Sequence, residues 1–531
     1  MKKKEIGSYY TPINLAKFIA NYCLSQIDKQ IISVLEPSVG DGTFVQAINE
    51  VENLSKFKRI NLTIVERENK ELKKALNKNT FKSIHISSFN KDYLNFHFEN
   101  KNKFSVVLGN PPYVKSNYLT KEQKVLAKQI HLEQNLADKT IKNIWTSFLV
   151  SGISKLEIKG ILALVLPLEL LQVKFTEEIR DLLKNSFERL EVFMFDELQF
   201  LECKGQDTVL LIGYKKHKVP GTFYTTIKSI EDLHKRNFRL YSNISISETN
   251  KKWTHHFITP EEHSFLENIK KELKPVSDYV DNKAGIVTAA NNYFIVDLET
   301  LTKFSLEKYA KPIVQKGGFV NGSVTFDNNN YYKLINENKP AYLLDFNNLD
   351  INNIPNNIDD YLLKGVEANL PSRFKCRQRK QWYQVPNIAV QSEAFFFKRA
   401  HEYPKLLKNE ANVFVTDSAY NIKMKESLNL NDFIFSFYNS FTLAFAELEG
   451  RYYGGGVLEL TPNEFRVLPI PMSSIQDFNS YKMLFSNKKD IDEVLSKFNY
   501  QILNSSLNLN REEINRIETI RIKLINKGLR K

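Results

Sequence analysis

The sequence of 531 residues has few cysteines and lacks a long apolar segment. Its three cysteines, Cys23, Cys203 and Cys376, are far apart, which argues against a disulfide framework and against a cysteine metal site. No stretch reaches the roughly 18 apolar residues that a membrane-spanning helix needs. The basic first residues run into a polar segment, so they do not form a secretory signal. These absences predict a cytoplasmic protein with reduced thiols, no membrane segment and no metal.

Acidic residues are outnumbered, because 61 Asp and Glu stand against 74 Lys and Arg, a formal net charge of +13. Such a surplus favours a polyanionic partner through counterion release, although a general bias toward lysine and asparagine would also produce it. The composition, 42% hydrophobic and 25% charged, is that of a globular protein. Since single cores stop growing at roughly 250–300 residues, the length predicts at least two domains.

Apolar runs alternate with helical patterns in the first part of the sequence. The runs lie at 32–35, 62–65, 104–108, 160–166, 190–195 and 208–214. Short buried strands separated by helices predict an α/β domain with a mostly parallel sheet, whose ligands bind at the carboxyl ends of the strands. From about residue 219 the pattern becomes irregular and polar. We place the first domain at 1–235, a connection at 236–271, a loop-rich second domain at 272–473 and a helical segment at 474–531.

Glycines and carboxylates follow the first two predicted strands. Gly40 and Gly42 open a helix, where the backbone turns tightly and its free N–H groups approach a ligand, but the third glycine of a dinucleotide fingerprint is missing. Glu36 ends the first strand, and Glu66 ends the second, where a carboxylate can bind both ribose hydroxyls. The pattern predicts a nucleoside-cofactor site, and the alternative is an ordinary turn beside solvated strand-end charges.

The segment from Asn110 to Tyr113, Asn-Pro-Pro-Tyr, directly follows the predicted strand 104–108. Its two prolines fix an extended turn and leave backbone carbonyls unpaired. The Asn110 side-chain oxygen and the Pro111 carbonyl can both accept from one amino group, which orients the nitrogen lone pair toward an electrophilic methyl. Tyr113 offers a flat ring to an unpaired base. The segment therefore predicts methyl transfer to an amino nitrogen.

Taken in order, these motifs resemble the gamma class of adenine-N6 DNA methyltransferases, the enzymes of TaqI-like and Eco57I-like restriction–modification systems. The segments that carry the resemblance are 7–12, 35–44, Glu66, 92–93, 110–113, 285–295, 416–422, 452–462 and 468–471. It implies a Rossmann-like α/β methyltransferase domain, an irregular α+β target-recognition domain and a helical C-terminal tail. It also implies S-adenosylmethionine as cofactor, double-stranded DNA as partner, and a monomer that acts with or without a separate cognate restriction endonuclease.

The resemblance also implies a role for each motif residue. The implied cofactor-binding residues are Tyr10, Thr11, Pro12, Glu36, Pro37, Gly40, Gly42, Phe44, Glu66, Asp92 and Tyr93. Among these, Glu66 would bind the ribose and Asp92 would accept from the cofactor's adenine amino group. The implied catalytic residues are Asn110, Pro111, Pro112, Tyr113 and Phe200. Phe200 would cover the second face of a flipped adenine, a role for which Phe193 and Phe195 are alternatives.

A basic segment at 372–383 alternates cations with aromatic residues, the composition of a surface that meets phosphates and grooves. The residues that we expect to contact DNA are Arg373, Lys375, Arg377, Arg379, Lys380 and Trp382. The alternative is a solvated basic loop with Trp382 anchored in the core.

Three other functions compete with a DNA methyltransferase. Asn-Pro-Pro-Tyr also occurs in methyltransferases of release-factor glutamines, but these are much shorter and lack a large second domain. An RNA methyltransferase is disfavoured by the recognition-domain segments. A non-catalytic DNA-binding subunit of a phage-defence complex would need neither the glycine loop nor the intact Asn110 motif. We expect no fused nuclease, because no Asp…Glu-x-Lys site is evident. The sequence therefore predicts a site-specific adenine-N6 DNA methyltransferase.

Overall fold

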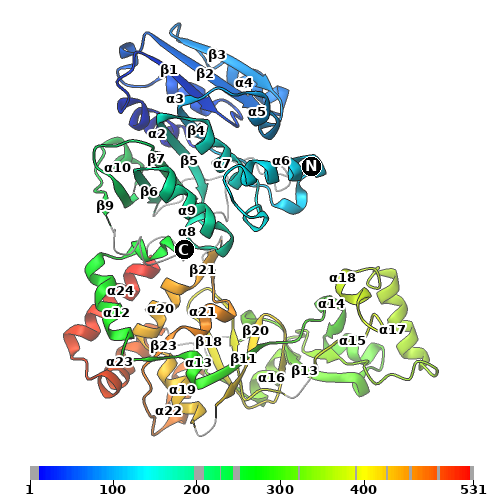
Figure 1. Cartoon of the computed structure of the whole chain (residues 1–531). Coiled ribbons are helices and arrows are strands. Elements are labelled where there is room, and N and C mark those ends of the chain that lie inside the picture. Colours follow the sequence, from blue (N-terminus) through cyan, green and yellow to red (C-terminus); the bar gives the residue numbers. More distant parts are fainter. Residues whose placement is uncertain are drawn as a thin grey trace.

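The computed structural model describes residues 11–195, 208–227, 229–242, 252–320, 323–388, 391–425, 428–453, 457–486 and 491–526. The chain folds into two parts, of which the first runs from blue to green and the second from green to red in Figure 1. Among the described residues, no helix has both the length and the apolar character that crossing a membrane requires.

A nine-stranded sheet in the order β3-β2-β1-β4-β5-β7-β6-β8-β9 forms the centre of the first domain. The strands are β1 (Ile31–Glu36), β2 (Arg59–Glu66), β3 (Ile84–Asn90), β4 (Phe104–Gly109), β5 (Leu156–Pro167), β6 (Arg189–Phe195), β7 (Thr208–Tyr214), β8 (Gly221–Ile227) and β9 (Tyr241–Ser242). The five strands from β3 to β5 are parallel, whereas β7 runs antiparallel between β5 and β6. The predicted α/β domain with a mostly parallel sheet is confirmed.

Helices cover both faces of this sheet. Those on one face are α2 (Ile13–Ser25), α3 (Thr43–Asn49), α4 (Asn69–Leu76) and α10 (Ile230–His234). Those on the other face are α5 (Tyr93–Glu99), α6 (Lys121–Leu132), α7 (Trp145–Lys155), α8 (Glu169–Gln172) and α9 (Glu177–Ser186). Successive strand residues point to opposite faces, so Val106 packs with the first group of helices and Val107 with the second. Covered on both sides, the strands are the continuous apolar runs of the sequence.

The second domain has an irregular α+β architecture, as predicted, with several small sheets. A five-stranded sheet contains β11 (Val280–Ala284), β20 (Ala419–Met424), β16 (Ala394–Phe397), β18 (Lys405–Asn409) and β14 (Thr325–Phe326). A four-stranded sheet contains β12 (Ile295–Val296), β15 (Tyr342–Leu344), β13 (Ala310–Val314) and β19 (Phe414–Val415). The remaining strands are β17 (Arg399–Ala400), β22 (Val457–Glu459) and β21 (Arg451–Tyr453) in one sheet, and β10 (Lys274–Pro275) with β23 (Pro469–Ile470).

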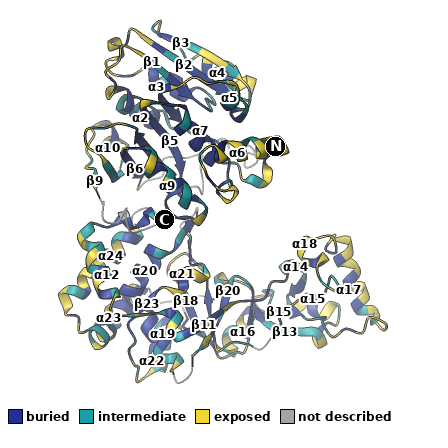
Figure 2. Cartoon of the chain, viewed as in Figure 1, coloured by how far each residue is buried: buried dark blue, intermediate teal, exposed yellow. Residues whose placement is uncertain are grey.

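One part of the second domain projects from the rest as an arm with its own core (Figure 1). Its helices are α14 (Asn291–Phe294), α15 (Leu298–Lys303), α17 (Asn356–Glu367) and α18 (Phe374–Arg377). Gly365 of α17 makes room for a ring, since a Cβ there would lie 2.0 Å from Trp382. Figure 2 shows many exposed residues along α17 and α18, at the far end of the arm.

Helices from distant parts of the chain complete the body of the second domain. They are α12 (Pro260–Lys270), α13 (Val276–Tyr279), α16 (Asn328–Asn336), α19 (Leu430–Phe437), α20 (Ser440–Glu449), α21 (Pro462–Arg466), α22 (Phe478–Ser486), α23 (Ile491–Leu507) and α24 (Arg511–Asn526). The C-terminal helix α24 packs along α20.

The two domains share one hydrophobic core and a pair of buried hydrogen bonds. The side chain of Gln172, at the end of α8, donates to the Tyr452 carbonyl (2.8 Å) and accepts from the Tyr452 N–H (3.1 Å). Trp253 and Phe257, before α12, belong to the same apolar cluster as Leu170 of α8. The second domain is therefore fixed against the carboxyl end of β5.

Candidate active site

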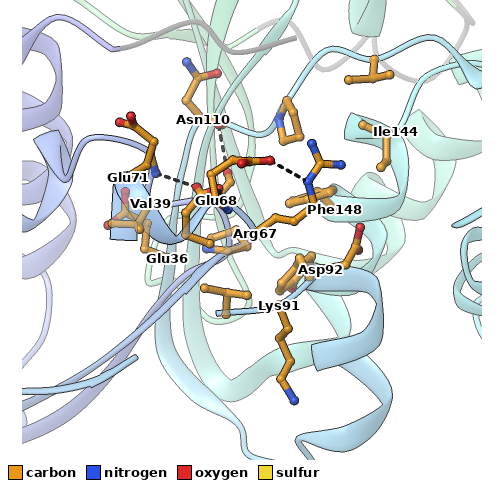
Figure 3. Close-up of a pocket in the computed structure, with 18 of the residues that line it drawn as sticks. Glu36, Val39, Arg67, Glu68, Glu71, Lys91, Asp92, Asn110, Ile144 and Phe148 are labelled. Carbon is orange, nitrogen blue, oxygen red and sulfur yellow. Dashed lines mark hydrogen bonds and ion pairs between the residues drawn. The ribbon is translucent and has the colours of Figure 1, made fainter. Parts of the chain in front are cut away.

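A cavity of about 260 Å³ lies at the carboxyl ends of β1, β2 and β4. Figure 3 shows Glu36 on one side of this cavity, Asp92, Ile144 and Phe148 on the other, and Asn110 above them. The predicted residues that line it are Thr11, Glu36, Pro37, Gly40, Phe44, Glu66, Asp92, Tyr93, Asn110 and Pro112. The predicted residues that lie beside it are Pro12, Gly42, Pro111 and Tyr113, while Tyr10 and Phe200 lie outside the described residues.

The glycine loop between β1 and α3 adopts the conformation for which glycine is suited. Gly40 and Gly42 have φ values of +53° and +82°, in the left-handed region that other residues rarely adopt. Gly42 also lacks space for a side chain, because a Cβ would lie 2.5 Å from the Ala75 Cα in α4. The loop therefore packs tightly on α4 and brings its backbone to the edge of the cavity.

Glu66 ties the ends of β1 and β2 together. One carboxylate oxygen accepts from the Gly40 N–H (3.0 Å) and the other from the Glu68 N–H (2.9 Å). The side chain of Asn90, at the end of β3, donates to the Glu66 carbonyl at 2.9 Å. Held in this way, the Glu66 carboxylate faces the cavity in a fixed orientation and can accept further hydrogen bonds from a ligand.

Two buried polar groups mark one end of the cavity. Glu36 is 1% exposed and Thr11 is 6% exposed. Within the described residues, no hydrogen bond reaches Oε2 of Glu36 or Oγ1 of Thr11. Burial raises the pKa of Glu36 well above its usual range, and the negative charges of Asp41 and Glu66 raise it further. Buried polar atoms without partners are rare, so both fit a ligand that carries a donor or a positive charge.

Asp92 is held between the first turns of two helices. Its Oδ1 accepts from the Leu94 N–H of α5 (2.8 Å), and its Oδ2 accepts from the Gln123 side chain of α6 (2.7 Å). Gln123 also forms a capping box with Thr120, through bonds of 3.1 Å in each direction. Gln123 was not predicted as a site residue, because nothing in the sequence relates residues 92 and 123.

The Asn110 motif and the glycine loop are joined by a hydrogen bond. The Ser38 hydroxyl, in the loop after β1, donates to the Asn110 carbonyl at 3.1 Å. Behind the motif, Tyr113 is 6% exposed and its hydroxyl donates to the Val165 carbonyl of β5 at 3.1 Å. These bonds fix the motif from both neighbouring strands and keep Asn110 at the border of the cavity.

Apolar side chains form the wall opposite Glu36. Ile144 and Phe148 come from the start of α7, and Leu119 from the segment before α6. A flat apolar wall near the Asp92 carboxylate suits a purine ring, which has apolar faces and a polar edge. This wall was not predicted, because the apolar pattern of α7 is that of an ordinary buried helix.

The basic segment lies on the arm, and the structure divides its residues into two groups. Arg373, Lys375, Arg377 and Lys380 are exposed. Arg379 is half-buried and donates to the Thr288 carbonyl at 2.7 Å. The half-buried Trp382 packs on the core of the arm and lies 5.6 Å from the Tyr293 ring, between centroids. DNA contact by these six residues remains a prediction.

Comparison with known proteins identifies the family. Residues 17–200 match the model of the Eco57I restriction-modification methylase, and residues 250–503 match that of the C-terminal domain of the Type II methyltransferase M.Eco57I. The chain belongs to the Eco57I family of restriction–modification methylases. The resemblance seen in the sequence motifs is thereby confirmed, and it extends through most of both domains.

Individual relatives agree with this family. The chain is 25% identical over 521 residues to the Type II methyltransferase M.AccI of Acinetobacter calcoaceticus, a match that covers 93% of this chain and 92% of M.AccI. It is 22% identical to the Type II methyltransferase M.BanIII of Aneurinibacillus aneurinilyticus, over 56% of this chain and 59% of that one. The structure of MmeI, a Type IIL restriction–modification enzyme in complex with DNA, has the same fold: the TM-score is 0.57 at 14% identity, over 96% of this chain and 75% of MmeI.

Proposed function

We propose that this chain is a site-specific DNA methyltransferase that transfers a methyl group from S-adenosylmethionine to the N6 amino group of adenine. The observation that carries the proposal is that Asn110 borders the same cavity as Glu36 and Thr11. The side-chain oxygen of Asn110 can accept a hydrogen bond from the amino group that receives the methyl. The buried oxygens of Glu36 and Thr11 beside it suit a positively charged cofactor. Membership of a methylase family supports the same reaction.

Each end of the cavity fits a different part of the cofactor. Thr11 and Glu36 would hold the methionine part, with the glycine loop beside them. Glu66 would accept from the ribose hydroxyls, and Asp92 from the adenine amino group. The ring would lie against Ile144 and Phe148. When bound, the cofactor supplies a methyl group on a positively charged sulfur.

The chain would receive the target base from duplex DNA. An adenine inside the helix cannot reach a recessed cavity, so the base would be rotated out of the stack by ~180°. The Asn110 side-chain oxygen and the Pro111 carbonyl would each accept a hydrogen bond from one N–H of the amino group, which loses a single proton to solvent once the methyl group is transferred. These hydrogen bonds draw the nitrogen lone pair out of conjugation and orient it toward the cofactor cavity, an effect of position and electrostatics. Tyr113 would support one face of the base and Phe200 the other, while Pro112 fixes the turn.

We also propose that the chain acts as a monomer and is the modification enzyme of a restriction–modification system, with any endonuclease on a separate chain. The exposed cations of the arm, Arg373, Lys375, Arg377 and Lys380, would contact phosphates, and the second domain would read base edges. The Type II methyltransferases that the chain resembles support this assignment.

Single-molecule sequencing of DNA from cells that express the wild type or Asn110→Ala tests the proposal. We expect N6-methyladenine at one recurring motif with the wild type and none with the variant. Calorimetry should show that Asn110→Ala still binds the cofactor, so that the loss is one of transfer. N4-methylcytosine at the motif would refute the choice of adenine, and wild-type methylation by the variant would refute the role of Asn110. No modified motif in either sample would favour an RNA, a glutamine or a non-catalytic function.

A further inference from the structure

The arm carries a second hollow, an open groove of about 840 Å³ that shares no residue with the cofactor cavity. Its walls are the turn from Val287 to Tyr293 and the segment from Leu370 to Lys375. Polar side chains that could pair with base edges line it, namely Asn291, Asn292 and Asp417. The rest of the lining is mostly apolar, and the groove differs from a small-molecule pocket in being open to solvent.

Phe374 stands in this groove with most of its ring in solvent, at 65% exposed. A ring that lines an open groove beside Arg373 and Lys375 can be buried by a binding partner, which would remove its apolar surface from water. Arg373 and Lys375 flank it in the sequence, and Arg377 lies one helical turn further along α18. Within the described residues, none of these three cations has a salt bridge, whereas Lys311 of the same arm pairs with Asp345 at 2.9 Å.

The groove has a rigid base. Arg379 donates to the Thr288 carbonyl, and Arg373 donates to the Ala289 carbonyl at 3.3 Å. Ala289 has a φ of +66°, so the turn is held in a strained conformation by its surroundings. Cys376 of α18 is fully buried beneath these contacts. The turn and α18 thus form one unit that presents Phe374 in a fixed position, which lowers the entropy cost of binding.

We propose that Phe374 inserts into the base stack of duplex DNA, while Arg373 and Lys375 contact the flanking phosphates. The inference rests on the proposed function, which makes duplex DNA the partner. The charge of the rim suits a polyanion, the mostly apolar lining suits stacked bases, and the Asn291 and Asn292 side chains suit base edges. An apolar side chain between base pairs opens a step and kinks the duplex, which brings more DNA onto the protein. In the view of Figure 1, α18 lies on the edge of the arm that points toward the catalytic domain.

Binding measurements on three variants test the inference. The probes are a duplex with the motif that the wild type modifies and a duplex with the same bases scrambled. Phe374→Ala should lose about tenfold in affinity for the motif duplex, with an unchanged salt dependence. Lys375→Ala should lower the affinity for both duplexes by the same factor. It should also reduce the slope of log affinity against log salt by about 0.9. The control, Tyr332→Ala, removes a ring of α16 that is 59% exposed in the same domain, and should change neither.

A fluorescent base locates the insertion. 2-Aminopurine at successive motif positions should brighten at the flipped target base and at one further step when the wild type binds, and only the signal at the further step should disappear with Phe374→Ala. The melting temperature of Phe374→Ala should equal that of the wild type, because the ring is exposed. If Phe374→Ala binds and methylates like Tyr332→Ala, the insertion is refuted while the methyltransferase stands. If the wild type neither binds nor methylates DNA, the proposed function itself fails.

Discussion

The cofactor cavity and the arm groove bind their proposed ligands by opposite means. In the cavity, Glu66 and Asp92 are each held by two hydrogen bonds, and Glu36 is buried. In the groove, Phe374 and Lys375 are exposed and the volume is about three times larger. A small ligand that must react is thus met by preorganised, desolvated groups. A large polyanion is met by solvated cations, which gain from counterion release without prior burial.

The comparison predicts where substitutions are tolerated. A change in the cavity alters groups that other residues hold, so it should affect stability and binding together. A change at Phe374 or Lys375 of the groove rim alters an exposed side chain, so it should affect DNA binding alone. The following variants test this difference, from the largest expected effect to the smallest.

Gly42→Ala should have the largest effect. The left-handed backbone costs an ordinary residue roughly 1–2 kcal/mol, and the new Cβ would overlap the Ala75 backbone at 2.5 Å. We expect the unfolding free energy to fall by about 3 kcal/mol and the cofactor affinity to fall by about 100-fold or more. Urea unfolding and calorimetry measure the two. The control is Gly318→Ala, since a Cβ at Gly318 meets nothing within 4 Å, and it should resemble the wild type.

Glu36→Gln should reveal the buried carboxyl through its pH dependence. The raised pKa of Glu36 means that the cofactor-free fold favours the protonated form, so its contribution to stability is lost as the pH rises above the ordinary range near 4.3. A bound cation favours the ionised form. Wild-type affinity for the cofactor should therefore rise between about pH 5 and pH 7.5, below the range in which the cofactor's own amino group titrates.

In Glu36→Gln this rise should be absent, with affinity about 30-fold below wild type at pH 7.5 and nearly equal to it at pH 5. The same variant, without cofactor, should melt a few degrees higher than the wild type at pH 7.5. Glu68→Gln changes an exposed carboxyl that lines the same cavity and should keep the wild-type profile. A wild-type affinity that is flat over this range would show that Glu36 does not change its protonation state when the cofactor binds, and would contradict this role.

The difference between the two regions also explains what the sequence could predict. Glu36 and Glu66 are the last residues of β1 and β2, and Asn110 directly follows β4; the buried parts of these strands form continuous apolar runs in the sequence. Once a parallel sheet is predicted, these ends must meet. The edge strand β3 was not predicted, because four of its seven residues are exposed and its sequence has no apolar run. The strand β8 fell in a stretch interpreted as irregular, although it pairs along its length with β6.

The sequence could not predict contacts that depend on the path of the chain. Gln123 donates to Asp92 although the two residues are 31 positions apart in the sequence. Phe148 lines the cavity, but the apolar pattern of its helix indicates only that the helix is buried. In the basic segment, Arg379 and Lys380 are adjacent and chemically alike. The structure makes Arg379 an anchor of the turn at Thr288 and leaves Lys380 exposed.

Gln123→Ala should have an intermediate effect, confined to the adenine end of the cavity. Without the 2.7 Å bond from Gln123, the Asp92 carboxylate keeps only its bond to the Leu94 N–H. We expect cofactor affinity to fall about tenfold, the equivalent of roughly 1.4 kcal/mol. An analogue with hydrogen in place of the adenine amino group should bind the variant and the wild type equally. Gln129→Ala, on the same helix, is the control, and an equal loss for cofactor and analogue would argue against positioning.

Arg379→Ala and Lys380→Ala should have the smallest effects. Together they distinguish a residue that holds the turn at Thr288 from an exposed cation in the same segment. Arg379→Ala removes hydrogen bonds to the Thr288 and Trp382 carbonyls, at 2.7 and 3.2 Å. Its local cost should be about 1 kcal/mol, seen as roughly fivefold faster amide exchange in the arm.

Lys380→Ala removes an exposed cation with no salt bridge in the described part of the chain. Amide exchange in the arm should then stay at the wild-type rate, while the salt dependence of DNA binding falls by about 0.9 in slope. Because the two residues carry the same charge one position apart, charge alone cannot produce opposite outcomes. Equal exchange rates in both variants would mean that Arg379 does not hold the turn, and the groove would lose the rigid base that presents Phe374.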